Sequence, residues 1–337
     1  MSLDLHHVAL GRRQPKNAPH LFLENYLTGV VPTAPVAADH FAKVPTWILG
    51  GNDQYGDCGP VSVANSRLLV TSYLTKPETV SQKDIFDLYR RSGNPNFDPT
   101  TDTDDNGVDM QTMLEAVVAG GIAGTKALGF ASVDVTSMNS LRDAIAIFGC
   151  LLLGVNLDTS QQNQPTVWDY VPSQAWGGHA VMSGRYSEAP DREGVISWAT
   201  KIDMTDAFEA HQLSEAWVVI WPEHLTSATF LAGVNLASLA ADYTALTGKP
   251  FPAVVPPTPA PPVPTPTPTP TPPTPTPPPT PAPTPPTPPA PTPKPKPLLE
   301  DIVLANAAGE WARGKHLCSS SANVAKALKV WLIAKGL

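Results

Sequence analysis

The segment Gly50–Pro60 reads Gly-Gly-Asn-Asp-Gln-Tyr-Gly-Asp-Cys-Gly-Pro, and it stands directly before an apolar stretch typical of a helix, residues 60–74. Pro60 suits the first turn of that helix, where its missing N–H costs nothing. Cys58 is therefore expected at a helix N-terminus, where the helix dipole and unpaired N–H groups favour a thiolate nucleophile. Glycines such as Gly56 let a substrate backbone approach closely. The alternative for this cysteine is a packing role.

A second segment, Trp176–Tyr186, places a histidine after two glycines and before an apolar strand. At the start of a strand, His179 is expected to face a cleft rather than lie buried in mid-strand. It could then take the proton of Cys58. A third segment, Val195-Ile196-Ser197-Trp198, is expected on the next strand of the same hairpin.

In this order the three segments resemble the papain-like cysteine peptidases. The residues around Cys58 are most similar to those of the double-glycine leader peptidases and their relatives. Further motifs make residues 10–225 most similar to uncharacterised phage and prophage proteins: Asn-Asp-Gln-Tyr-Gly-Asp-Cys, Trp-Gly-Gly-His-Ala-Val, Ser-Trp, Met204-Thr205 with Phe208, and Glu215-Ala216. The resemblance implies a two-lobed α+β fold and hydrolysis of peptide or amide bonds.

The resemblance also implies roles for individual residues. Cys58 would be the nucleophile and His179 the general base, paired as thiolate and imidazolium. Asn52, six residues before the nucleophile, would supply an oxyanion-hole amide, with Gln54 as the second choice. The residue that orients the histidine falls on Ile196, which leaves a Cys/His dyad. Ser197, beside it, is the remaining candidate catalytic residue.

Three further residues are candidates for the substrate site or its surroundings. Trp176 would line the cleft, Gly178 would allow close approach of a substrate, and Trp198 would shield the ring of His179 from water. Core packing is the alternative for both tryptophans. Asp57 places a carboxylate beside Cys58, and its negative charge would oppose a low thiol pKa.

The remaining elements indicate an α+β domain in two lobes, with helices first and strands afterwards. Cys150 lies within an apolar run and is expected in the core. Helices are expected at residues 81–92, 109–119, 140–148, 205–211 and 234–246, and strands at 150–157, 179–186, 194–199 and 216–220.

Proline divides the chain of 337 residues, because 26 of its 40 prolines lie between residues 252 and 297. We expect a papain-like domain over residues 1–250 and a polyproline II linker over 251–297, reaching about 140 Å at about 3.1 Å per residue. Residues 298–337 form two amphipathic stripes, each with one tryptophan. They predict a helical hairpin that docks on a partner or on a second copy.

Charge and composition exclude several classes of protein. A net charge of -8 argues against nucleic-acid binding. We expect neither a signal peptide nor a membrane span. Three widely spaced cysteines fit neither a disulfide framework nor a zinc site, and no cofactor or metal is expected. The segment 102–107 matches the opening of a calcium loop, but Met113 replaces the bidentate glutamate, so a solvated loop is expected.

Two hypotheses follow. The first is a phage-associated papain-like cysteine hydrolase, tethered by the proline-rich linker and carried in the virion or held in the host cytoplasm until lysis. Its substrate would be a peptide, a protein or peptidoglycan, and residues 298–337 would bind a phage structural protein or self-associate. The second is a catalytically inactive papain-like domain that serves as a virion structural or host-surface binding protein.

Overall fold

The computed structural model describes residues 4–28, 34–188 and 190–252. Almost all of the expected linker and the whole expected hairpin, residues 298–337, lie outside the described residues. Those two expectations therefore stay predictions. None of the described helices is long and apolar enough to cross a membrane.

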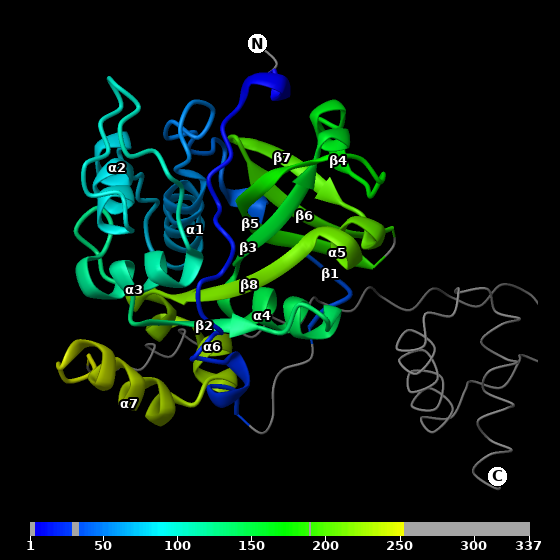
Figure 1. The fold of residues 1–337 in the computed structure, drawn as a ribbon. Helices are drawn as coiled ribbons and strands as arrows, with labels where there is room; N and C mark the ends of the chain where they lie inside the picture. The colour runs from blue at the N-terminus through cyan, green and yellow to red at the C-terminus, as the bar shows by residue number, and fades with distance from the viewer. Residues whose placement is uncertain (1–3, 29–33, 189, 253–337) are drawn as a thin grey trace, which may run out of the picture. The chain divides into compact units, whose positions relative to one another are not determined.

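Three helices of the first half occur where the sequence predicts them (Figure 1). They are α1 (Cys58–Leu74), α2 (Gln82–Arg91) and α3 (Met110–Gly120). Ser81 and Asp109 cap the second and third helices by accepting hydrogen bonds from the backbone N–H groups of Asp84 and Thr112. Such caps are local signals, so the boundaries can be read from the sequence.

The second half forms one mixed sheet in the order β2-β8-β3-β5-β6-β7-β4. The strand β1 pairs with the C-terminal part of β5, beyond the part that pairs with β3. All pairs are antiparallel except β4 with β7. The strands are β1 (Ala37–Asp39), β2 (Gly129–Val133), β3 (Leu151–Asp158), β4 (Val167–Trp168), β5 (Ala175–Glu188), β6 (Asp191–Ser197), β7 (Thr200–Met204) and β8 (Leu213–Ile220).

The other helices are α4 (Met138–Phe148), α5 (Asp206–Gln212), α6 (Ala228–Gly233) and α7 (Leu236–Thr247). The sequence pattern did not predict α6 or the strands β1, β2, β4 and β7. These elements are short or partly polar, and tertiary pairing rather than local pattern makes them regular.

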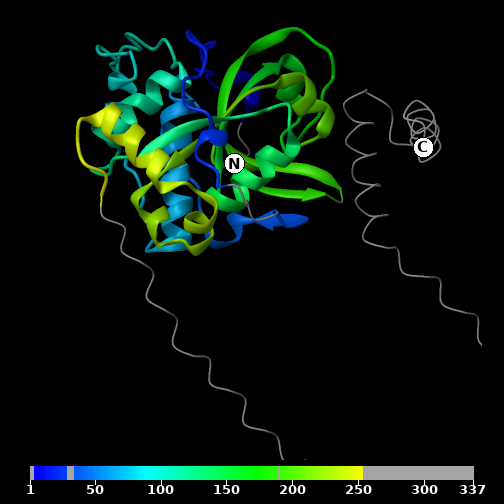
Figure 2. The same cartoon turned by 90° about the horizontal axis from the view of Figure 1, so that it is seen from below.

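Two apolar clusters hold the domain together. One joins α1, α2 and α3 to one face of the sheet and contains Cys150, as predicted. The other joins α4, α5 and α6 to the opposite face. Figures 1 and 2 show α1–α3 on one side of the molecule and the strongly curved sheet on the other.

An extended N-terminal segment runs between the helices and the sheet, in dark blue in Figure 1. The N–H of Arg12 donates to the carbonyl oxygen of Gly178 on β5 at 3.0 Å. On the other side, the N–H of Arg13 donates to Val108 O at 2.8 Å, and the N–H of Val108 donates to Gly11 O at 2.7 Å. The chain start is thus hydrogen-bonded to both halves of the domain.

Candidate active site

Cys58 is the first residue of α1, as the sequence predicts, but it is fully buried, with 0% of its surface exposed. Burial raises the pKa of its thiol to about 11. Backbone amides of Ala180, Gly11 and Gly59 act in the opposite direction by hydrogen bonding to the sulfur. The amide of Ala180 places the sulfur beside β5, immediately next to His179.

His179 lies within β5, opposite Val155 of β3, and it is also 0% exposed. The expectation that His179 opens the strand and faces a cleft is therefore wrong, because β5 already begins at Ala175 and the imidazole ring is buried. Burial, and to a smaller extent the nearby charge of Arg12, lowers the pKa of His179 to about 3. With the thiol pKa at about 11, both groups are neutral at pH 7. The implied thiolate–imidazolium pair is not the state of this closed site.

Ser197, not Ile196, contacts the histidine. The ring atom Nε2 of His179 lies 2.8 Å from Ser197 Oγ. Ile196 instead packs in the apolar cluster under α1, because successive residues of a strand face opposite sides of the sheet. The orienting position predicted at Ile196 is therefore wrong by one residue. If Ser197 accepts the Nε2 proton, Nδ1 is the basic atom of the ring.

The tryptophans form a stack over the histidine. The ring of Trp198 lies 4.4 Å from that of His179 at an interplanar angle of 17°, and Trp176 stacks on Trp198 at 6.1 Å. Trp198 and Ala199 have φ values of +47° and +58°, which make the tight turn from β6 to β7. This turn holds the indole plane against the imidazole and excludes water from that side.

The two candidate oxyanion amides have different environments. Asn52 is 2% exposed, in the segment that leads into α1, and its Oδ1 has no hydrogen-bond partner among the described residues. Gln54 is exposed, and its backbone N–H donates to Gly51 O in a turn. Of the two side chains, only that of Asn52 is buried with Cys58.

An acidic network lies near the nucleophile, and the sequence pattern did not predict it. Asp105 accepts hydrogen bonds from the N–H of Gly56 at 2.9 Å and the hydroxyl of Tyr89 at 2.6 Å. Burial, and then the charge of Asp105, raises the pKa of Asp57 well above its usual range. The charge of Asp57 raises the pKa of the Cys58 thiol, as expected, but burial of the thiol is the larger cause. The calcium-like turn, residues 102–107, was the signal for this network. Asp105, in this turn, holds the backbone of Gly56, two residues before α1 begins. Among the described residues, no group of acidic, cysteine or histidine side chains could hold a metal ion.

Residues 10–13 of the N-terminal segment cover Cys58 and His179, and we call them the covering segment. A Cβ at Gly11 would lie 1.9 Å from the carbonyl oxygen of Gly56, so only glycine fits there. The guanidinium of Arg12 donates to Glu215 Oε1 at 2.6 Å and to Asn156 Oδ1. A substrate can reach Cys58 only if this segment moves. No sequence signal singled it out.

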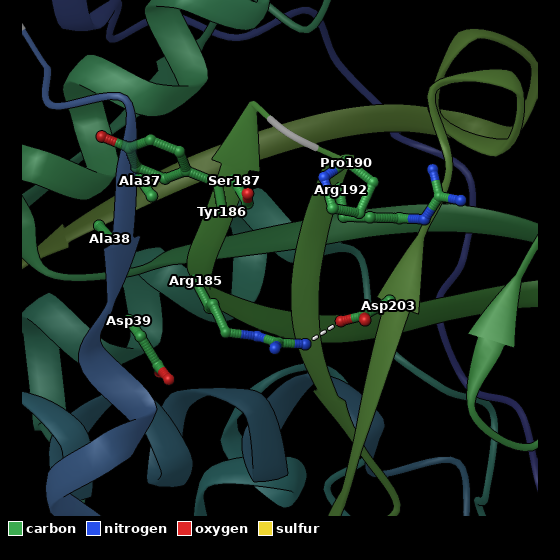
Figure 3. A pocket seen from close by; sticks show the side chains of 9 residues that line it. All are labelled: Ala37, Ala38, Asp39, Arg185, Tyr186, Ser187, Pro190, Arg192 and Asp203. Carbon is green, nitrogen blue, oxygen red and sulfur yellow. Dashed lines mark hydrogen bonds and ion pairs between the residues drawn. The ribbon is translucent and has the colours of Figure 1, made fainter.

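A surface pocket of about 410 Å³ lies elsewhere and is lined by residues of β1, β5, β6 and β7 (Figure 3). An ion pair between Arg185 and Asp203 forms part of its wall, and the side chain of Arg192 points away from that pair. Neither Cys58 nor His179 lines it. Its lining residues are Ala37, Ala38, Asp39, Arg185, Tyr186, Ser187, Pro190, Arg192 and Asp203.

Comparison with solved structures identifies the fold. The chain is similar to xylellain, a cysteine protease from Xylella fastidiosa, at 14% identity and a TM-score of 0.52, over 64% of this chain and 97% of that one. It also matches digestive procathepsin L 3 from Tenebrio molitor larval midgut (12% identity, TM-score 0.47, 64% and 77% coverage). A third match is a Carica candamarcensis cysteine protease in complex with E-64 (17%, 0.43, 56% and 99%).

No family model and no curated protein matches the chain. The likeness to xylellain is therefore a likeness of fold. The described domain has the papain-like cysteine protease fold, so the predicted α+β class is confirmed.

Proposed function

We propose that the protein is a cysteine peptidase or amidase whose active site is closed by its own covering segment. Cys58 is the nucleophile, His179 the general base, and Ser197 holds the imidazole. One observation carries the proposal: at the start of α1 the sulfur of Cys58 accepts a hydrogen bond from the amide of Ala180, the residue after a histidine whose Nε2 is held by Ser197.

Opening the covering segment would change both pKa values in the direction that catalysis needs. Water would reach the thiol, and the smaller desolvation cost would lower its pKa while the amides of Gly59 and Ala180 still favour the thiolate. Departure of Arg12 would remove a charge that lowers the pKa of His179. The thiolate–imidazolium pair would then form in the open state.

The reaction would proceed in two steps. The Cys58 thiolate attacks the carbonyl carbon of the scissile bond, and the His179 imidazolium gives its proton to the leaving amine, which leaves a thioester. A water molecule, deprotonated by His179, then hydrolyses the thioester and restores the thiol. Asn52 is the side-chain candidate for stabilising the oxyanion in both steps.

Alkylation of the full chain by iodoacetamide tests the dyad. We expect slow labelling of Cys58 in the wild type, with a pH midpoint near the thiol pKa of about 11. In Arg12→Ala the midpoint should fall by at least about one pH unit and peptide hydrolysis should appear. Adding His179→Ala should abolish both gains. Cys150, which is buried away from the pair, is the internal control. If Arg12→Ala labels Cys58 quickly but His179→Ala changes neither rate nor pH midpoint, the dyad assignment is wrong.

We also propose a phage setting, with the domain carried by residues 298–337 in a virion or released from host cytoplasm at lysis. The resemblance of the ordered motifs to those of phage and prophage proteins supports this. The expected substrate is then a protein or a peptidoglycan cross-link. A phage carrying a deletion of residues 298–337 should lose the protein from purified particles, whereas retention would contradict the docking role.

A second candidate function is an inactive papain-like binding module. The closed site favours it, because Cys58 and His179 are fully buried and neutral beneath the covering segment. In that case Cys58→Ser should leave infection unchanged. A Cys58→Ser phage as defective as a complete deletion would exclude it.

A further inference from the structure

The site that holds Arg12 has the construction of a recognition site for an arginine side chain. Arg12 has a fully buried side chain, and its two terminal nitrogens bond to acceptors on different strands, Glu215 on β8 and Asn156 on β3. The indole N–H of Trp217 donates to the other oxygen of Glu215 at 2.8 Å and so fixes the carboxylate. A planar fork of donors suits two separated acceptors better than an ammonium group does.

Two glycines make room for that side chain. A Cβ at Gly154 would lie 2.4 Å from Glu215 Cγ and 2.8 Å from Arg12 Cδ. A Cβ at Gly178 would lie 2.2 Å from the carbonyl oxygen of Arg12. Any larger residue at either position would displace the arginine or its carboxylate partner, so these two strand positions fit the occupied state.

The backbone of the same arginine lies at the candidate catalytic pair. Its N–H donates to Gly178 O, immediately before His179, and the preceding residue, Gly11, hydrogen-bonds through its amide to the sulfur of Cys58. A peptide that Cys58 attacks must place its own backbone in this position. The side chain at the position of Arg12 then reaches Glu215.

When the covering segment leaves, Glu215 loses its cation. Its hydrogen-bond donors among the described residues are Arg12 and Trp217, so only the neutral indole N–H remains. Water that enters the opened site replaces the cation only in part, and a cationic side chain of a substrate would restore the charge pair as it excludes that water again. The segment therefore acts as a stand-in for the ligand that replaces it.

We propose that Glu215, with Asn156, is the specificity-determining residue of this site and selects peptide or protein substrates that carry an arginine close to the scissile bond. The inference rests on the proposed peptidase function. It favours a protein or peptide substrate and ranks arginine above lysine, because the two acceptors match the guanidinium fork.

A binding experiment tests this without hydrolysis. The full chain carrying Cys58→Ser and Arg12→Ala is titrated with an end-blocked peptide of the sequence of residues 9–14, Ala-Leu-Gly-Arg-Arg-Gln. Two matched peptides replace the first arginine by citrulline, which has the same shape without the charge, or by lysine. We expect the arginine peptide to bind about 10- to 100-fold more tightly than the citrulline peptide, with lysine between them.

Adding Glu215→Gln should bring the arginine and citrulline affinities to within about twofold. Adding Asp203→Asn, which removes a half-exposed ion pair with Arg185, is the control and should leave the ratio unchanged. Should Glu215→Gln fail to fold, the three peptides on the protein with Glu215 intact still decide the question.

Equal affinity for the arginine and citrulline peptides would overturn the proposal, and so would the absence of binding by the arginine peptide at millimolar concentration. An arginine preference in a protein that hydrolyses nothing would instead refute only the peptidase function. Hydrolysis by the Arg12→Ala protein without any arginine preference would refute only the role of Glu215.

Discussion

Glu215 and Glu193 are both buried carboxyl groups on the sheet, but their surroundings are opposite. Glu215 is bonded to the guanidinium of Arg12 and to an indole N–H. Glu193 accepts the hydroxyl of Ser183 at 3.1 Å, and its other oxygen has no partner among the described residues. The two carboxylate oxygens of Glu209, on α5, also lack a partner there. Burial raises the pKa of Glu193 to about 8, and burial together with Glu193 raises that of Glu209 to about 9.

The difference shows how this fold uses buried acids. Where a segment distant in sequence brings a cation, the carboxyl group becomes an attachment point, and the segment stays in place only while the pair is intact. Where no cation bonds to the acid, as at Glu193 and Glu209, on which Arg142 acts only through its charge, the acid stays protonated at neutral pH and the fold bears a penalty that grows as the acid ionises. Each site can be broken separately.

The largest effect is expected at the paired site. Glu215→Ala leaves the Arg12 guanidinium buried with only Asn156, and breaking such a pair costs about 3–5 kcal/mol if the arginine must stay buried. Release of the covering segment relieves part of that cost. We therefore expect the rate of Cys58 alkylation to rise about 100-fold, with a smaller loss of global stability in urea.

Asp203→Ala is the matched control for this variant, because its ion pair with Arg185 is half-exposed and surface pairs contribute about 0–1 kcal/mol. It should change the Cys58 alkylation rate less than about threefold. Equal alkylation rates in Glu215→Ala and the wild type would show that the buried pair does not hold the segment.

The unpaired site predicts an effect on stability that depends on pH. Both glutamates have pKa values above the ordinary 4.5 when folded. The folded protein therefore keeps protons that the unfolded chain releases, and stability falls as pH rises from about 4.5 through about 8 and 9. We expect Glu209→Gln to be more stable than the wild type by at least about 2 kcal/mol at pH 9 and nearly equal to it at pH 5.

Urea unfolding at the two pH values measures this, with Glu115→Gln, an exposed acid on α3, as the control. If wild type and Glu209→Gln lose the same stability between pH 5 and pH 9, the buried pair is not the source of the pH dependence. The alkylation rate of Cys58 at fixed pH should not follow the change, because the covering segment does not contact these glutamates.

The contrast between local and distant contacts also explains what the sequence could predict. Cys58 at the start of α1, and the caps Ser81 and Asp109, depend on neighbours within one turn, so periodicity and capping rules find them. The pairing of Arg12 with Glu215 joins residues 203 positions apart, in a stretch that has no periodicity. No local rule reveals such a contact, and so the closed state was missed.

The error at Ile196 has a different origin. The third motif and its strand were predicted correctly, but a strand alternates its faces at every residue, and a shift of one position exchanges the core side for the histidine side. Register of this kind is set by pairing across β5 and β6, where an irregularity lies between Ser183 and Arg185. A single sequence does not record that irregularity.

The smallest expected effect distinguishes Ser197 from Ile196 directly. In the Arg12→Ala background, Ser197→Ala removes the hydroxyl at Nε2, so the imidazole loses its preferred orientation and tautomer. We expect hydrolysis to slow about tenfold. If no substrate has been found, the rate of Cys58 alkylation at pH 7 is measured instead and should fall by the same factor. Ile196→Val should cost about 1 kcal/mol of stability through lost packing and leave the rate unchanged. Ser197→Thr, which keeps the hydroxyl, should recover part of the rate. Loss of rate in Ile196→Val with none in Ser197→Ala would return the orienting role to the position that the sequence first indicated.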